Sequence, residues 1–222
     1  MGYAGALAGF AQPLAAFAAG LGTVFVVTSL SIRQGRISTS AFLLSGVVVG
    51  TFLWSLIPLM LSLSKNDQRQ GHIISQLLGN LEGIGWEKLY ALAIFGTLGG
   101  ISLYLANREL NLMALGEESA ARLGVNTEAF KLRVIVTGAL LTSVSVAAAG
   151  MIAFVGLIVP HLTRRITGPD HRWLLAGSAI MGALLLVVSD WVSRVFLNGI
   201  EVGVVTSITG AVLFCFILRK QV

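Results

Sequence analysis

The sequence has few charged residues, one cysteine and none of the common catalytic motifs. Charged residues make up 11% of the 222 residues, against about 25% in soluble domains, too few to cover a water-facing surface. The single cysteine, Cys215, excludes an internal disulfide and a cysteine metal cluster. The motifs GxxxxGK[ST], HExxH and GxSxG are absent, which argues against P-loop ATP binding and against metal or nucleophilic catalysis. We therefore expect no catalytic residue, metal site or bound cofactor on this chain.

Apolar sequence is present along almost the whole chain. Apolar residues make up 55%, and the mean hydropathy is +0.86. Because long apolar runs recur from end to end, the sequence predicts an integral membrane protein. The net charge of +5 comes from short basic clusters between these runs, which membrane orientation explains without a nucleic-acid partner. The opening MGYAGALAGFAQPLAAF has no basic n-region, so it does not indicate a signal peptide.

The apolar runs predict seven membrane crossings. About 20 apolar residues cross a bilayer core, and five runs meet or approach this length: residues 10–30, 41–63, 89–106, 173–195 and 202–218. Residues 132–162 would form a helix about 45 Å long, too long for one crossing. Gly150, Gly156 and Pro160 also interrupt this run. We therefore predict two elements, about 132–149 and 151–162, with the second short and packed within protein.

Basic residues predict the orientation of this all-α bundle, which forms a single domain over residues 1–222. With the N-terminus outside and the C-terminus in the cytoplasm, 11 of the 15 lysines and arginines are cytoplasmic, as the positive-inside rule requires. Segment 107–131 is then cytoplasmic and segment 62–88 lies outside. In the outer segment four apolar residues follow helical spacing and predict a short amphipathic surface helix: Ile73, Ile74, Leu77 and Leu78.

Residues 110–125, LNLMALGEESAARLGV, form a charged island in an apolar chain. We predict two short helices, 110–115 and 118–123, separated by Gly116 and ended by Gly124. Glu118 and Arg122 have the favourable i,i+4 spacing, yet each helix is too short to be stable alone. The residues leave two alternatives open: a rigid knob that binds a partner, or an amphipathic loop that lies on lipid.

Three ionisable residues near apolar sequence need explanation. Asp190 and Arg194 lie one turn apart toward the outer end of an apolar helix. Intramembrane charges often mark function, but a local salt bridge with a snorkelling arginine is an equal alternative. His161 follows Pro160 and has no second ligand at metal-binding spacing, so we expect a structural role for it.

Four stretches together resemble one family: LNLMALGEESAARLGVN, VAAAGMIAFVGLIVPHLTRRITGPDHR, ALLLVVSDWVSRV and VGVVTSITGA. In this order and spacing they are similar to permease subunits of ABC importers for iron–siderophore complexes, haem and cobalamin. The resemblance implies a subunit of ten transmembrane helices in the cytoplasmic (inner) membrane, of which this chain matches the last seven. It also implies a second permease, identical or related, two ATPases that bind ATP and Mg, and an extracytoplasmic binding protein.

The resemblance assigns roles to particular residues. The charged island matches the segment that docks into the ATPase, carried here by Asn111, Leu112, Met113, Ala114, Leu115, Gly116, Glu117, Glu118, Ala121, Arg122, Leu123 and Gly124. Arg194 matches the outer face that meets carboxylates of the binding protein. The helix over residues 40–63 and the last helix match those that line the translocation path, with the candidates Ser45, Thr51, Ser55, Thr206 and Thr209.

Three functions therefore remain in view. The first is an ABC importer permease that moves an iron–siderophore complex, haem or cobalamin with ATP hydrolysed on the partner. The second is a seven-helix secondary transporter or channel, which would need an ion site at mid-membrane, whereas the sequence offers only Asp190 near one end. The third is a truncated, non-functional remnant of the permease.

Overall fold

A computed structural model describes residues 2–33, 36–63 and 67–219, with side chains of the first helix described from Ala15 onward. Lys65 and Lys220, two of the charges used to predict orientation, lie outside these residues. The described residues form ten helices: α1 (Gly2–Ser31), α2 (Thr39–Leu63), α3 (Asp67–Leu78), α4 (Trp86–Leu105), α5 (Asn107–Met113), α6 (Glu117–Arg122), α7 (Thr127–Ala149), α8 (Val155–Thr167), α9 (His171–Phe196) and α10 (Val202–Arg219). The predicted all-helical fold is confirmed.

A short hairpin, with two residues in each strand, joins α1 to α2. Its strands, β1 (Ile32–Arg33) and β2 (Arg36–Ile37), pair antiparallel, with Ile32 opposite Ile37. So short a hairpin is marginal in isolation. Side chains of α7 hold it through hydrogen bonds to Ile37.

Within the residues that the structure describes, four helices are long and apolar enough to cross a membrane: α2, α4, α7 and α9. Two shorter apolar stretches, Ala15–Ser31 and Val202–Leu213, belong to α1 and α10. No residue of α2 is buried within the chain, and its exposed side chains are mostly apolar, as hydrocarbon surroundings require. The number of crossings and their direction stay predictions from length and charge.

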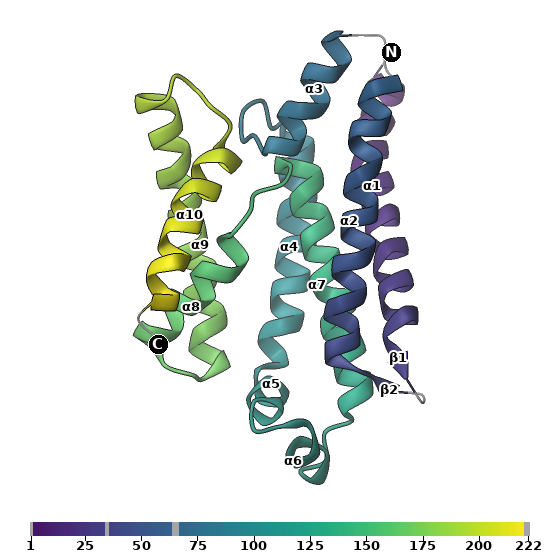
Figure 1. The fold of residues 1–222 in the computed structure, drawn as a ribbon, viewed down its shortest axis with the longest axis vertical. Coiled ribbons are helices and arrows are strands. Elements are labelled where there is room, and N and C mark those ends of the chain that lie inside the picture. Colours follow the sequence, from purple (N-terminus) through teal and green to yellow (C-terminus); the bar gives the residue numbers. More distant parts are fainter. Residues whose placement is uncertain (1, 34–35, 64–66, 220–222) are drawn as a thin grey trace.

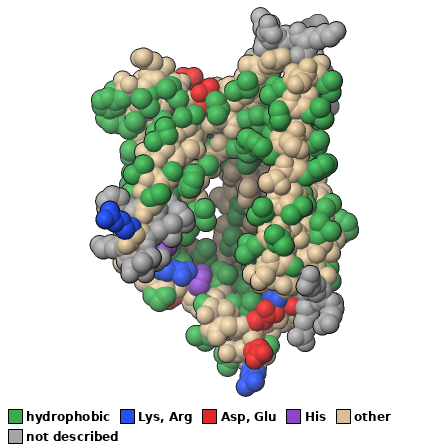
Figure 2. Space-filling model, viewed as in Figure 1, with side chains coloured by type: hydrophobic (Ala, Val, Ile, Leu, Met, Phe, Trp, Pro, Cys, Tyr) green, Lys and Arg blue, Asp and Glu red, His purple; other side chains and the backbone are tan. Residues whose placement is uncertain are grey.

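The helices form two layers (Figure 1). One layer holds α1, α2, α4 and α7, where α7 contacts both α1 and α4; the other holds α8, α9 and α10, which contact one another. The layers touch where α4 meets α9. Figure 2 shows a hollow in the surface between the two layers. We call these the four-helix layer and the three-helix layer.

Opposite ends of the bundle carry different small elements. Helices α5 and α6 project together at one end, and α3 lies at the other (Figure 1). We call residues 107–124 the knob, and the two ends the knob end and the α3 end.

At the α3 end, main-chain hydrogen bonds tie the turn after α3 to both layers. The Gly203 N–H of α10 donates to the Gly79 carbonyl at 3.2 Å, and the Asn80 N–H donates to the Ala149 carbonyl at 2.9 Å. A Cβ on Gly203 would overlap the Leu78 carbonyl oxygen and lie 2.8 Å from that of Met151. Only glycine allows this close approach. We call this region the glycine seam.

The long run 132–162 divides as predicted, but the break between its two helices is longer than predicted. Helix α7 ends at Ala149, and α8 begins at Val155 rather than near residue 151. Gly156 and Pro160 lie within α8, so the prediction that they interrupt the helix is wrong. Pro160 lies in the second turn, where it removes a single helix hydrogen bond, the one to the Gly156 carbonyl. The residue that changes direction is Phe154, whose φ of 66° is left-handed.

Candidate coupling surface and polar path

The knob consists of two short helices with a tight turn between them. Helix α5 follows α4 after the single residue Ala106, which is 1% exposed. Gly116 has a φ of 104° and precedes α6. Glu117 and Glu118 occupy the first turn of α6 and Arg122 the last, which is the favourable arrangement for the helix dipole. The helices begin three residues and one residue earlier than the sequence predicts.

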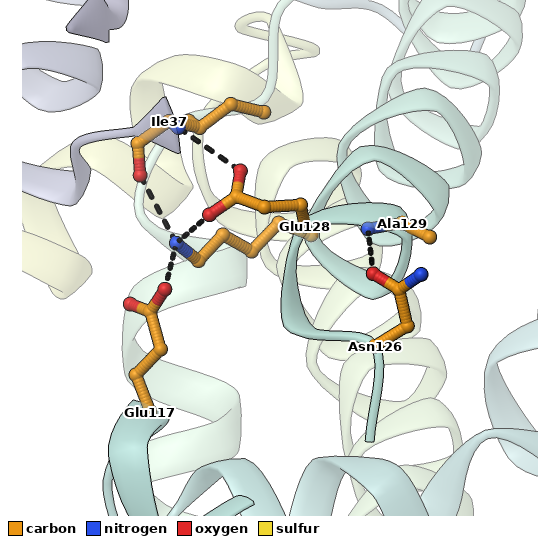
Figure 3. Close-up of polar contacts among 6 residues, drawn as sticks. Ile37, Glu117, Asn126, Glu128 and Ala129 are labelled. Atoms are coloured by element: carbon orange, nitrogen blue, oxygen red, sulfur yellow. Dashed lines mark hydrogen bonds and ion pairs between the residues drawn. The ribbon is translucent and has the colours of Figure 1, made fainter. Parts of the chain in front are cut away.

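The end of α6 has a defined capping motif. The Gly124 N–H donates to the Ala121 carbonyl, and the Val125 N–H donates to the Ala120 carbonyl. This hydrogen-bond pair is a Schellman motif. It requires a left-handed residue at Gly124, whose φ is 88°. Asn126 then caps α7, because its side-chain oxygen accepts from the Ala129 N–H at 3.2 Å, as Figure 3 shows.

A largely buried lysine side chain connects the knob to the four-helix layer. Lys131 of α7 donates to Glu117 of α6 at 2.5 Å, to Glu128 at 3.1 Å and to the Ile37 carbonyl of β2 at 3.0 Å. The Glu128 carboxylate also accepts from the Ile37 N–H at 3.0 Å, so it bridges hairpin and lysine (Figure 3). The Lys131 side chain is only 12% exposed. All three ammonium donors have acceptors, which fixes their direction. We call these four residues the Lys131 cluster.

An amide connects the knob to the three-helix layer. The Asn111 amide nitrogen of α5 donates to Asp170 at 2.8 Å, and the Asn111 oxygen accepts from the His171 N–H at 2.9 Å. His171 Nδ1 lies 2.7 Å from the same oxygen. An amide oxygen can only accept, so Nδ1 carries the proton. Asp170 also caps α9 by accepting from the Arg172 N–H. We call these three residues the Asn111 cluster.

The charge of Asp170 is favoured by these donors. The Arg172 main-chain N–H and then the Asn111 amide lower the pKa of this carboxyl below its ordinary value. Asp170 is therefore ionised at neutral pH, and can only accept hydrogen bonds there.

The outer surface of the knob is both apolar and charged. Leu115 and Leu123 are 66% and 60% exposed, whereas Ala120 beneath them is fully buried. Among the described residues no ion pair joins Glu118 to Arg122, so the pair expected from their spacing is not formed. Both side chains are exposed, where such a pair contributes little. Exposed leucines between free charges suit a protein partner.

A cavity of 450 Å³ lies beside the knob. It is lined by residues of α5, the α6–α7 turn and α7, including Arg108, Leu112, Leu123, Phe130 and Arg133. Its lining combines apolar side chains with two arginines and Glu109, so it could receive a partly apolar segment of another protein with a net acidic charge. The knob therefore offers a protruding surface and an adjacent recess.

The five candidate path residues fall on two helices in different layers. Ser45, Thr51 and Ser55 belong to α2, and Thr206 and Thr209 belong to α10. Thr51 and Ser55 are exposed, whereas Thr206 is 2% exposed and buried within the chain. The hydroxyls of Thr51, Ser55, Thr206 and Thr209 donate to carbonyls of their own helices.

The two helices nevertheless meet at one cavity of 320 Å³. Its lining includes Trp54 of α2, Met151, and Ser207 of α10. Trp54 and Ser207 are sequence neighbours of the candidates Ser55 and Thr206. The structure thus brings the two predicted helices together, but it does so through residues that the sequence did not single out.

Arg194 is engaged by carboxylates of its own chain. Its Nε donates to Asp190 at 2.8 Å, one turn earlier on α9, and its guanidinium lies 3.7 Å from Glu82. The Arg194 side chain remains 48% exposed. The local salt bridge is therefore present, and Glu82 is a partner that the sequence did not indicate.

His161 lies on α8 and has a buried ring nitrogen. Within the described residues its Nε2 has no hydrogen-bond partner, and the same holds for the Ser178 hydroxyl of α9. No group of three or more metal-ligating side chains occurs among the described residues. His161 thus has no ligand partners from this part of the chain.

Sequence analysis missed the residues that anchor the knob. Lys131 lay at the edge of the predicted coupling segment, and Glu128, Asp170 and His171 received no role. A signal was present for Asp170, because an aspartate before an apolar helix is a common N-cap. The contact of Lys131 with Ile37 could not be predicted, because these residues are 94 positions apart.

A bundle of apolar helices that carries a small helical knob at one end has the architecture of a membrane-embedded transport subunit. The sequence profile of the FecCD transport family matches residues 1–220. The chain therefore belongs to the FecCD transport family, and it is a multi-pass protein of the cytoplasmic membrane.

Curated relatives are permease proteins. The chain is 38% identical over 97% of its length to the uncharacterized ABC transporter permease protein YvrB of Bacillus subtilis. It is 37% identical over 95% of its length to the cobalamin import system permease protein BtuC of Halobacterium salinarum. It is 34% identical over 97% of its length to the hemin transport system permease protein HmuU of Yersinia pestis. The alignments cover 61%, 56% and 64% of these relatives, so the chain spans about three fifths of their length.

A solved structure has the same fold. An inward-facing conformation of a metal-chelate type ABC transporter matches with a TM-score of 0.84 and 28% identity. The match covers 96% of this chain and 72% of that one. The resemblance noted from the sequence is thereby confirmed at the level of the family.

Proposed function

We propose that this chain forms the membrane pathway of an ABC importer for a metal chelate or a corrin- or porphyrin-type compound, with iron–siderophore, haem and cobalamin as candidate substrates. ATP is hydrolysed on separate partner subunits, and this chain is not an enzyme. Family membership over residues 1–220 carries the proposal. The named cargoes of BtuC and HmuU support the substrate class.

The knob is the proposed docking site for the ATPase. It offers two exposed leucines and free charges on helices held by the Asn111 and Lys131 clusters. When ATP closes the ATPase pair, the knob moves with it, and the layers change their separation. The movement is driven by the difference in the free energy of the contacts between knob and ATPase in the open and closed states of the ATPase pair.

The other partners are proposed on the same basis. A second permease, identical or related, completes the pathway, and lipid covers the remaining apolar faces. A binding protein delivers substrate at the α3 end, where Arg194 is the candidate contact. Because Asp190 and Glu82 already flank Arg194, docking there requires a carboxylate of the partner to compete with them.

Co-purification with an ABC ATPase subunit of the same transport system tests the proposal. We expect wild type and Leu115→Met to retain the ATPase in detergent. Leu115→Asp should lose it, because a buried unpaired carboxylate at the interface is strongly unfavourable. The conservative variant controls for side-chain size. Failure of wild type to retain any ATPase, or equal retention by all three proteins, contradicts the proposal.

A further inference from the structure

The Asn111 and Lys131 clusters lie on opposite sides of the knob. Asn111 of α5 contacts Asp170 and His171 at the start of α9, in the three-helix layer. Glu117 of α6 contacts Lys131 of α7, in the four-helix layer. Helices α5 and α6 also contact each other. The knob therefore bridges the two layers at one end of the bundle.

Each cluster fixes direction as well as distance. The Asn111 amide faces a carboxylate on its donor side and two donors on its acceptor side, so a flipped amide would lose all three contacts. Lys131 has three acceptors from three different elements, namely α6, α7 and β2. Because both clusters hold the same knob, a rotation of the knob changes the hydrogen bonds of both.

The Lys131 cluster extends to α2. Ile37 lies two residues before α2 begins at Thr39, and both its main-chain groups are held, the N–H by Glu128 and the carbonyl by Lys131. Helix α2 has no buried residue of its own. It packs along α1, and at the knob end its start is also held by the hairpin, which this cluster ties to α7.

We infer that the Asn111 and Lys131 clusters are the mechanical links that convert movement of the knob into a change in the separation of the two layers. Lys131 and Asp170 are then positioning residues, since they act through the knob rather than by touching the ATPase or the substrate. The inference rests on the proposed function for its ATP-driven part. The ties between knob and layers stand on the geometry alone.

Variants of the partner residues separate a link from simple folding. Asp170→Ser keeps a side chain that caps α9 but is too short to reach Asn111. Asp170→Asn keeps both the cap and an acceptor for the Asn111 amide. Lys131→Met removes the three donors at similar length, and Lys131→Arg restores a cationic donor. Each broken link thus has a matched variant that preserves it.

Spin-label distances test the ties without any ATPase. All labelled variants are made in a Cys215→Ser background. Labels at Glu118→Cys and Ile166→Cys report the distance from the knob to the three-helix layer. Labels at Glu118→Cys and Ile32→Cys report the distance from the knob to the hairpin of the four-helix layer. We expect Asp170→Ser to broaden only the first distance distribution and Lys131→Met only the second. Asp170→Asn and Lys131→Arg should keep both narrow. Unchanged distributions in both broken variants would overturn the inference.

Transport measurements in reconstituted vesicles test the coupling. Asp170→Ser and Lys131→Met should retain the ATPase, yet the substrate moved per ATP should fall on the order of tenfold, within the range typical of coupling between sites. Asp170→Asn and Lys131→Arg should restore it. Broadened distances with an unchanged ratio would overturn the coupling role. If wild type binds no ATPase, the proposed function fails, and the spin-label distances still decide whether the ties exist.

Discussion

Gly203 lies where three main-chain segments meet at the α3 end, and it shows how one residue can set the contact between layers. Its N–H donates to Gly79, while the carbonyls of Leu78 and Met151 occupy the space where a side chain would begin. The hydrogen bond and the close approach of the two carbonyls together fix the position of the Gly203 main chain. The seam therefore tolerates no methyl group without a shift of main chain.

Gly203→Ala should destabilise the protein by about 1–3 kcal/mol, the usual cost of overpacking. The measurement is the free energy of unfolding in mixed micelles. Gly46→Ala on α2 is the matched control, because nothing lies within 4 Å of a Cβ built there, and it should leave stability unchanged. Equal stability of the two variants would show that the seam is looser than the structure indicates.

The individual helices were largely predictable from hydrophobic runs, because length and apolarity alone decide which segments suit a membrane. Helices α2 and α9 begin within two residues of their predicted starts at residues 41 and 173. The start of α8 was wrong by four residues. There the direction change depends on Phe154 in a left-handed conformation, and propensity gives no warning of that at a phenylalanine.

The knob was predictable as two short helices, but its attachment was not. Gly116 and Gly124 mark the turn and the end in the sequence, and both have positive φ in the structure. The ties from Asn111 to Asp170 and from Lys131 to Ile37 join segments 59 and 94 residues apart. Such contacts depend on how the layers pack, which local sequence does not encode.

Asn126 connects the end of the knob to α7 and gives a prediction at the scale of the element. Asn126→Ala should cost about 1 kcal/mol, because the Ala129 N–H loses its cap. Amide hydrogen exchange in the first turn of α7 should become about fivefold faster, as this free energy corresponds to. Asn126→Ser preserves a capping oxygen and should exchange as wild type does. Unaltered exchange at Ala129 in the alanine variant would refute the capping role.

The whole molecule has a fixed end and a bridged end. At the α3 end the glycine seam joins the layers through main-chain hydrogen bonds, which leave little freedom. At the knob end the layers are joined through side-chain clusters on two short helices. Side-chain hydrogen bonds can exchange partners more easily than closely packed main-chain segments can move apart. Movement of the knob should therefore open or close the hollow from the knob end, about the seam.

We propose that the knob is the surface by which ABC ATPase subunits drive this chain. A photoreactive residue placed at Leu115 in the knob, and for comparison at Glu82 at the α3 end, tests it in membranes that also contain the ATPase. We predict a crosslinked adduct with the ATPase from position 115 and none from position 82. No adduct from position 115, or equal adducts from both positions, would contradict the account.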